Sequence, residues 1–203
     1  MAIRNLRFHD DPALRKRCKE VKTVDDKIRL LLDDMLETLH QTENGAALAA
    51  NQVGILKRLV VIDYCDYQLK LVNPKIVGYS GVQECIEGCL SFPNRFIKTI
   101  RPQKVTIESL NEYGEEILIT GENEMAKCFC HELEHLDGII FLDGRENCSQ
   151  VPSDPGKPSS HWKEARFFKH HTLFVKRIFC LLSRAGYLYF RAKYLFFHGS
   201  GVP

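Results

Sequence analysis

Residues 122–138 read ENEMAKCFCHELEHLDG, and this stretch does most to decide the fold. It contains no proline, and its first glycine is Gly138, which stands where a helix stop is expected. The sequence therefore predicts a helix over Glu122–Leu136. Within that helix the segment HELEH forms an HExxH pattern, whose two histidines share one helical face.

The HExxH pattern gives the predicted helix a chemical role. His131 and His135 can bind one metal ion, while Glu132 faces the water that the ion activates. A solvated helix face with two incidental histidines is the alternative, and the position of the pattern inside a breaker-free helical window argues against it.

The residues on the N-terminal side read as another helix followed by strands. Thr23 and Asp26 have capping-box spacing, and apolar residues then recur at helical intervals through about His40. Apolar or β-branched runs at 59–62 and 69–72 indicate strands, and these runs are punctuated by Asn73-Pro74, Gly78, Gly81 and Pro93.

The clearest hairpin joins Lys104–Glu108 to Glu116–Thr120 through the turn formers of residues 111–114. We therefore expect an α+β fold, with antiparallel or mixed β-sheets around a central helix that bears HExxH. An N-terminal helix would precede these sheets, and a divergent basic extension would follow them.

A breaker-rich segment divides the chain. The predicted domains are a catalytic domain at 1–146, a linker rich in proline, serine and glycine at 147–160, and a basic aromatic extension at 161–203 with helical character. The net charge of +2 hides an asymmetry, because residues 145–203 contain ten basic and three acidic residues and so carry +7, against −5 for the rest.

The basic aromatic extension predicts contact with a membrane surface, with RNA or with a partner such as the ribosome. A nonfunctional extension, including one produced by an altered reading frame, is the competing interpretation. The first ten residues lack the apolar run of a signal peptide, and no stretch reaches about 18 uninterrupted apolar residues, so we expect a cytoplasmic protein.

HExxH alone leaves the third metal ligand open. The metzincin pattern HExxHxxGxxH is matched through Gly138 but has Phe141 at its third-ligand position, so a metallopeptidase would need another ligand, with Asp143 as a candidate. Cys89 offers a ligand from upstream, because Gly88 beside it lets the backbone approach a helix closely. A thiolate and two imidazoles leave a tetrahedral metal ion its fourth position for water.

Cys128 and Cys130 suggest a further possibility, a local structural zinc site with the two histidines. This arrangement is disfavoured because residues two apart on a helix face different directions. Residues 45–52, GAALAANQ, form a third notable segment. Their small side chains let another backbone come close, and Gln52 could donate to an oxygen that becomes negative, although alanines also serve simply to pack a helix.

Together the three segments resemble the motifs of the peptide deformylase family. Glu87–Ser91 matches EGCLS in full, and His131–Gly138 matches HExxH followed by an apolar residue, a variable residue and glycine. The first segment matches GxGxAAxQ except for Ala47 at the second glycine. The resemblance runs from about Ile3 through Asp143.

This resemblance implies a hydrolase that removes the formyl group from the N-terminal formyl-methionine of newly synthesised proteins and releases formate. Formyl-methionyl nascent peptides would be the substrates. The cofactor would be one divalent metal ion per chain, Fe²⁺ in this family, which Zn²⁺, Ni²⁺ or Co²⁺ can replace. An HExxH metallopeptidase with a different third ligand is the alternative function.

The resemblance also implies roles for individual residues. Three residues would bind the metal ion: Cys89, His131 and His135. The catalytic groups would be Glu132 as acid and base, and Gln52 with the backbone amide of Leu90 as donors to the oxyanion. The peptide would lie along four residues: Gly45, Ala47, Glu87 and Gly88.

Two departures from the family pattern affect the peptide site. The methyl group of Ala47 would narrow the cleft in which the peptide lies as an added strand, which predicts weaker or altered binding. Glu124 and Lys127 stand seven and four residues before His131, where relatives have apolar residues that line the methionine pocket. An ion pair on a solvated helix face is the alternative interpretation of these two residues.

Overall fold

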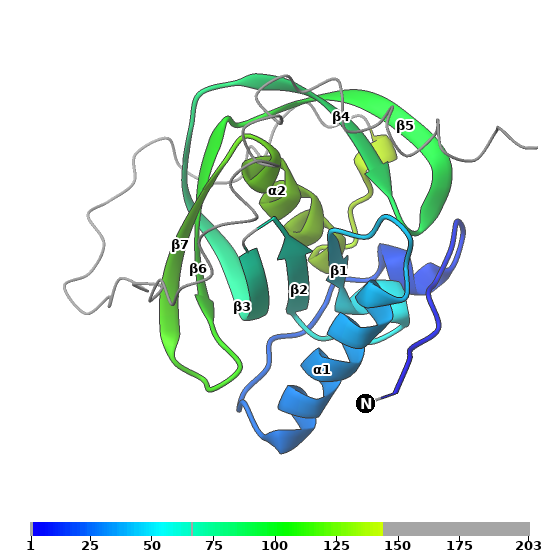
Figure 1. Cartoon of the computed structure of the whole chain (residues 1–203), viewed down its shortest axis with the longest axis vertical. Helices are drawn as coiled ribbons and strands as arrows, with labels where there is room; N and C mark the ends of the chain where they lie inside the picture. Colours follow the sequence, from blue (N-terminus) through cyan, green and yellow to red (C-terminus); the bar gives the residue numbers. More distant parts are fainter. Residues whose placement is uncertain (1, 66, 144–203) are drawn as a thin grey trace, which may run out of the picture. The chain divides into compact units, whose positions relative to one another are not determined.

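A computed structural model describes residues 2–65 and 67–143, and these ranges contain two α-helices and seven strands (Figure 1). The predicted linker and extension lie outside them. The helices are α1 (Asp26–His40) and α2 (Glu124–Leu136). The strands are β1 (Ala47–Ala49), β2 (Leu59–Tyr64), β3 (Tyr67–Ser80), β4 (Gln83–Cys89), β5 (Phe92–Arg101), β6 (Lys104–Leu110) and β7 (Glu116–Glu122). Short 3₁₀ turns occupy η1 (Pro12–Arg15), η2 (Ala50–Val53) and η3 (Phe141–Asp143).

The strands form two sheets, and every strand pair in the described ranges is antiparallel. One sheet has the order β1-β2-β3-β6-β7, and β4 and β5 form the other. The expected α+β class is confirmed. We expected antiparallel or mixed sheets, and the two described sheets are antiparallel. Among these residues no helix is long and apolar enough to cross a membrane.

Alternation along β1 and β2 sends successive side chains to opposite faces of the larger sheet. Val60 and Ile62 join a core cluster with α2 residues such as Phe129, whereas Leu59 and Val61 join a different cluster with α1. The two helices therefore cover the two faces of the same strands.

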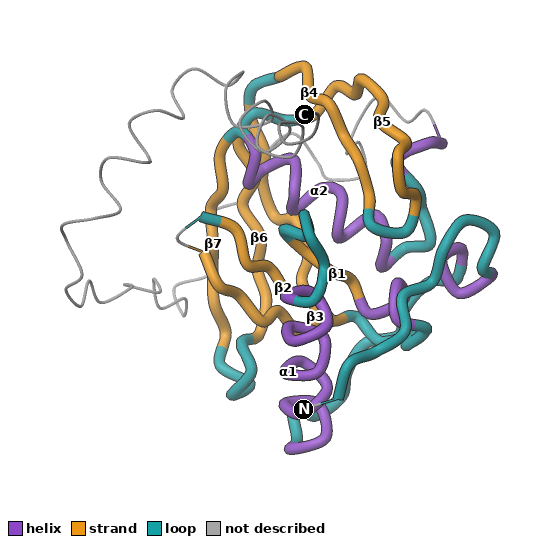
Figure 2. Tube along the Cα trace, turned by 45° about the vertical axis from the view of Figure 1, so that its right-hand side comes forward, coloured by secondary structure: helices purple, strands orange, loops and turns teal. Residues whose placement is uncertain are grey.

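Helix α2 contacts both the larger sheet and β5 of the smaller one. In Figure 1, β4 and β5 arch over the side of α2 that is turned away from β1 and β2, and Figure 2 shows the same arrangement from a second direction. Residues supplied by α2 thus meet residues supplied by β4, although 34 residues separate the ends of these elements in the chain.

Several details of the secondary structure differ from the prediction. The side chain of Asp25, not that of Thr23, caps α1 by accepting from Ile28 N at 2.9 Å. Helix α2 begins at Glu124 rather than Glu122, and Gly138 follows it in the left-handed conformation expected of a helix stop (φ 74°). The hairpin of β6 and β7 is confirmed.

Asn73 and Pro74 were expected to end a strand, but β3 runs through them. Asn73 adopts φ 53°, a left-handed conformation that asparagine tolerates, within a register shift between Val72 and Lys75. Its side-chain amide donates to Val21 O and accepts from Val21 N, both at 2.8 Å. These two hydrogen bonds to Val21 hold the bulge in place, which allows β3 to continue beyond it.

Candidate metal centre

Three potential metal ligands converge between β4 and α2. Cys89, at the end of β4, lies 3.2 Å from His135 through its Sγ and the imidazole Nε2, and the rings of His131 and His135 meet edge to face at 4.9 Å. Ligand atoms of all three residues lie within 4.8 Å of one another. No other such group of three is found in residues 2–65 and 67–143.

The donor set and its surroundings suit a cation. Burial lowers the pKa of His131, but hydrogen bonds to Cys89 and Glu87 outweigh it and raise that pKa to about 10. A metal ion bound here would take the place of the imidazole proton, because only the deprotonated nitrogen binds a metal ion. Burial and the neighbouring His131 lower the pKa of His135, which keeps its imidazole neutral, the form that binds metal ions. One thiolate and two imidazoles leave a tetrahedral ion one open position, the arrangement of catalytic rather than structural sites.

Glu132 lies one residue beyond His131, and its carboxylate is buried. Its Oε2 has no hydrogen-bond partner among the described residues. Burial, opposed by the charge of His131, raises the pKa of Glu132 to about 7. A carboxyl group poised near neutrality can both accept and release a proton, which general acid–base catalysis requires.

Gln52 reaches the same site from the other direction. Its segment forms β1 and then the turn η2, and the side-chain Oε1 accepts from Ala49 N at 2.8 Å. This contact turns the amide Nε2 toward Ser91 Oγ at 3.2 Å and Cys89 Sγ at 3.5 Å. The segment of small residues is therefore a strand and a turn, not a helix face.

Glu87 has three protein partners in the described part of the chain. Its Oε2 accepts from His131 Nδ1 at 2.8 Å, and its Oε1 accepts from Thr99 Oγ1 and from Arg101 Nε, each at 2.5 Å. Burial would raise the pKa of Glu87, but these hydrogen bonds and charges hold it far below its usual range. Because Nδ1 of His131 is engaged, its Nε2 is the nitrogen left for a metal ion.

Sequence reasoning missed four residues that contact this site. Arg101 and Thr99 hold Glu87, Ser91 accepts from Gln52, and Asn51 donates from Nδ2 to His135 O at 2.5 Å. The period of two in β5 places Thr99 and Arg101 on one face, but that signal becomes useful only when the pairing with β4 is known.

The residues predicted to contact substrate lie around this centre. Ala47 is buried in β1, which occupies an edge of the larger sheet among the described strands. A Cβ atom on Gly45 would come within 2.6 Å of Leu39 and 3.2 Å of Leu90, and one on Gly88 would come within 2.6 Å of the Phe96 ring. A side chain at either glycine would therefore require these neighbouring side chains to shift.

Glu124 and Lys127 form the i,i+3 ion pair that was one of their two interpretations, with 2.5 Å between Nζ and Oε2. Lys127 also donates to Ile86 O at 3.2 Å, so its ammonium group bridges α2 and β4. The pair is thus more than a solvated helix face, since it joins the two elements that supply the metal ligands.

The alternative ligand sets do not assemble. Neither Cys128 nor Cys130 belongs to a metal-binding group within the described ranges, and Cys130 is fully buried in the α2 core cluster. Asp143 accepts from Arg15 Nη1 at 2.6 Å and from Ile140 N at 3.0 Å. Among the described residues, Cys89 is therefore the thiol that is grouped with the two histidines, and Cys128 and Cys130 are not.

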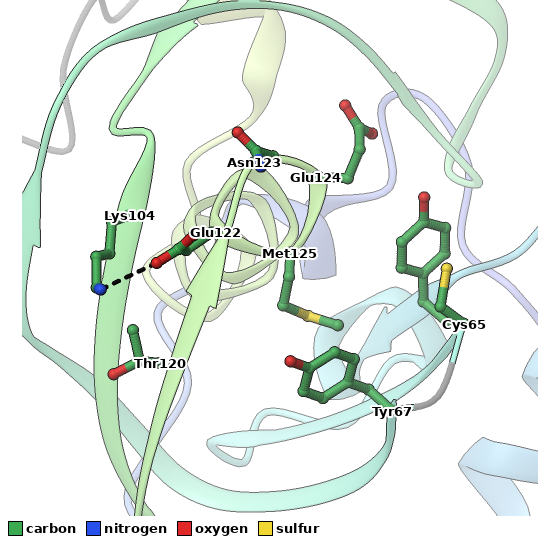
Figure 3. Close-up of a pocket in the computed structure, with 9 residues that line it drawn as sticks. Cys65, Tyr67, Lys104, Thr120, Glu122, Asn123, Glu124 and Met125 are labelled. Atoms are coloured by element: carbon green, nitrogen blue, oxygen red, sulfur yellow. Dashed lines mark ion pairs between the residues drawn. The ribbon is translucent and has the colours of Figure 1, made fainter. Parts of the chain in front are cut away.

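A separate pocket of about 540 Å³ opens at the other end of α2 (Figure 3). Met125 lies near Tyr67 in this view, and Lys104 forms an ion pair with Glu122 at 2.9 Å. None of the three candidate metal ligands lines it. Its lining consists of Tyr64, Cys65, Tyr67, Lys104, Thr120, Glu122, Asn123, Glu124 and Met125.

Comparison with known proteins gives one consistent result. The family model described as Polypeptide deformylase matches residues 3–151. The chain is 62% identical to peptide deformylase 2 of Clostridium acetobutylicum over 143 residues, which cover 70% of this chain and 95% of that protein. It is 49% identical to the peptide deformylase of Acetivibrio thermocellus over the same length, covering 84% of that protein.

Solved structures agree with the sequence matches. A peptide deformylase from Legionella pneumophila has a TM-score of 0.68 and 39% identity, and the match covers 71% of this chain and 86% of that one. A peptide deformylase from Ehrlichia chaffeensis in complex with actinonin has a TM-score of 0.69 and 35% identity, covering 71% of this chain and 90% of that one.

Proposed function

Since the chain belongs to the polypeptide deformylase family, we propose that Cys89, His131 and His135 bind its catalytic metal ion and that Glu132 moves the proton. The protein is a hydrolase that removes the formyl group from the N-terminus of newly made peptides in a metal-dependent reaction. The observation that carries the residue assignment is the convergence of one thiol and two imidazoles within 4.8 Å.

The metal ion would supply Lewis acidity, which polarises the formyl carbonyl group and lowers the pKa of water from about 15.7 toward about 7. Fe²⁺ is our proposal for the native ion, on the family resemblance, with Zn²⁺, Ni²⁺ and Co²⁺ as functional replacements. The mixed sulfur and nitrogen donors of the site are compatible with all four.

Glu132 would accept a proton from the attacking water as the water oxygen adds to the formyl carbon. Its unpartnered Oε2 and its pKa of about 7 support this role. As the bond between the formyl carbon and the amine nitrogen breaks, Glu132 would deliver the proton to that nitrogen. Formic acid and a peptide with a neutral amine are the immediate products, and transfer of the acid proton to the amine gives formate and an ammonium group, so atoms and charges balance.

Gln52 and the backbone amide of Leu90 would stabilise the negative charge that develops on the formyl oxygen. The contact with Ala49 fixes the orientation of the Gln52 amide, so the donor is already aimed before substrate arrives. Leu90 directly follows Cys89, which brings its N–H close to the same centre.

The edge that β1 forms among the described strands would hold the peptide backbone by adding a strand. Gly45 and Ala47 would provide this edge, and Gly88 would provide the opposing backbone. The side chain of Glu87 is occupied by protein partners, so its predicted contact with substrate would be made by its backbone, while the carboxylate orients His131.

We place this activity in the first of the three predicted domains, residues 1–146, and in the cytoplasm, where formyl-methionyl chains emerge from the ribosome. The proposed linker at 147–160 and extension at 161–203 lie outside the described residues. Contact of the extension with the ribosome, RNA or a membrane stays a prediction from its basic and aromatic composition.

Formate release from a short formyl-methionyl peptide, by full-length protein loaded with Fe²⁺ without oxygen, tests the function. We expect turnover that requires the formyl group and that fades in air as the iron or the Cys89 thiolate is oxidised. Cleavage of internal peptide bonds without formate release would instead indicate the metallopeptidase.

A further inference from the structure

Arg101, the last residue of β5, lies buried between two carboxylates. It donates to Glu87 Oε1 from Nε at 2.5 Å and to Glu87 Oε2 from Nη2 at 3.1 Å. On its other side it donates to Glu134 Oε1 from Nη1 at 2.5 Å and to Glu134 Oε2 from Nη2 at 2.8 Å. Both pairs are bidentate, which fixes the guanidinium plane as well as its position.

The two carboxylates belong to the two elements that supply the candidate metal ligands. Glu87 stands two residues before Cys89 in β4, and Glu134 stands immediately before His135 in α2. By holding both, Arg101 joins the strand that bears the thiol to the helical turn that bears an imidazole. The distance between these elements sets the separation of the Cys89 and His135 ligand atoms.

The network also reaches the remaining ligand directly. Glu87 Oε2, which accepts from Arg101, accepts as well from His131 Nδ1 at 2.8 Å. A carboxylate behind a histidine fixes the orientation of the ring and strengthens its other nitrogen as a metal donor. Arg101 holds that carboxylate in place, so its effect would extend to all three ligands.

The charges favour this arrangement over a purely structural one. Arg101 is 2% exposed and Glu87 1% exposed, and two carboxylates face a single guanidinium. Burying such charges gives little net stability compared with apolar packing. The bidentate contacts, in contrast, restrict the geometry of the groups that they join. The excess negative charge borders Nδ1 of His131, behind the ring whose other nitrogen, Nε2, is left for a metal ion.

We propose that Arg101 is a positioning residue for the metal centre, acting through Glu87 on His131 and through Glu134 on the helical turn of His135. The inference rests on the proposed function only in requiring that this centre bind a metal ion. It concerns the affinity and geometry of that centre rather than the reaction that takes place there.

The test compares full-length Arg101→Met with Arg58→Met as a matched control. Arg58 is also largely buried and pairs with Asp137 at 2.7 Å, but it does not contact the metal cluster. The affinity for Co²⁺ is measured by competition with a chelator, the geometry by the visible absorption of bound Co²⁺, and folding by thermal unfolding. We expect Arg101→Met to bind Co²⁺ about 10- to 100-fold more weakly with an altered spectrum, and Arg58→Met to bind it normally.

Two further variants keep the test decisive if Arg101→Met fails to fold. Glu134→Gln removes the charge of one of the two carboxylates that contact Arg101 but preserves its shape. It should weaken Co²⁺ binding about tenfold, the lower end of the range expected for Arg101→Met. Arg101→Lys restores the charge but not the bidentate geometry, and should rescue binding only in part. Wild-type affinity and spectrum in Arg101→Met or Glu134→Gln, or an equal loss in Arg58→Met, would overturn the proposal.

Deformylation is measured separately on the wild-type protein. If that protein binds Co²⁺ but releases no formate, the proposed function fails, while the affinity comparison still decides the role of Arg101.

Discussion

The two faces of β1 and β2 are built by the same alternation of side chains, yet they bury different chemistry. The α1 face is aliphatic, with Leu32 and Met35 of α1 packed against Leu59 and Val61. The α2 face has an apolar cluster of its own, and α2 in addition packs against β4 and β5, where histidines, carboxylates and a guanidinium are buried. We therefore expect the apolar α1 side to contribute stability and the buried polar groups on the α2 side to contribute to the reaction.

Burying polar groups costs free energy unless each finds a partner, so a protein has little reason to do this for stability alone. Three buried side-chain atoms near α2 lack hydrogen-bond partners within the described ranges: Asn51 Oδ1, Glu132 Oε2 and His135 Nδ1. Such exceptions concentrate where function constrains the sequence. Substitutions on the α2 side should therefore alter metal binding or catalysis, and those on the α1 side should alter stability.

The largest expected effect is that of Cys89→Ala. With only two imidazoles the site cannot hold an open tetrahedral ion, so both bound metal and formate release should fall to background. Metal content by mass spectrometry and formate release by a coupled assay check this. Cys85→Ala, which removes the other thiol of β4, is the control, and full metal occupancy in Cys89→Ala would refute the ligand assignment.

Gln52→Ala should reduce turnover about 100- to 1,000-fold, or about 2.7 to 4 kcal/mol, because it removes the proposed donor to the developing oxyanion. The three ligands remain, so metal content should stay at the wild-type value. Single-turnover kinetics measures the effect on the chemical step, and thermal unfolding measures the cost of losing the Ala49 contact. A change confined to substrate affinity would place Gln52 outside the transition state.

Leu32→Ala tests the other face. Leu32 is fully buried, so its truncation should lower the free energy of unfolding by about 3 kcal/mol through lost burial and a cavity. Denaturant titration gives this number. Turnover per folded molecule should not change, and a large loss of turnover at full folding would show that the two faces are not separate.

Asp34→Asn should have the smallest effect and a distinct pH dependence. Burial raises the pKa of Asp34, but hydrogen bonds from Ala2 N and the Arg4 side chain outweigh it and lower that pKa. The stabilisation, about 2 kcal/mol for bonds to a charged group, is thus present above the ordinary aspartate pKa of about 3.9 and is lost as pH falls through the folded value. Unfolding at pH 7 and pH 3 checks this, since a pH-independent difference would contradict the charge-based explanation.

The predictable parts of the molecule are those with a strong local signal. A breaker-free window, a glycine stop and histidines one turn apart led to α2, and an asparagine and glycine turn led to the hairpin of β6 and β7. The thiol at Cys89 could be assigned only with the help of a family resemblance, because 41 residues lie between it and His131 in the chain.

The unpredictable parts depend on tertiary partners. Nothing local distinguishes Arg101 from other arginines, because its importance arises from two carboxylates supplied by β4 and α2. The continuation of β3 through Asn73 was not predicted, because in the sequence Asn73-Pro74 has the composition of a turn. In the structure Asn73 is left-handed and lies in a bulge within the strand. Glu87 was predicted as a substrate residue, while the structure gives its carboxylate to His131, Thr99 and Arg101.

The most direct measurement of the central claim combines metal analysis with single-turnover kinetics of Glu132→Gln. This change preserves shape and all three proposed ligands but removes the carboxylate that we propose accepts and returns the proton. We predict one metal ion per chain, as in the wild-type protein, and a chemical step slowed about 100- to 10,000-fold. Near-normal turnover by the fully metallated variant would contradict the assignment of Glu132, even if Cys89, His131 and His135 all proved to bind the ion.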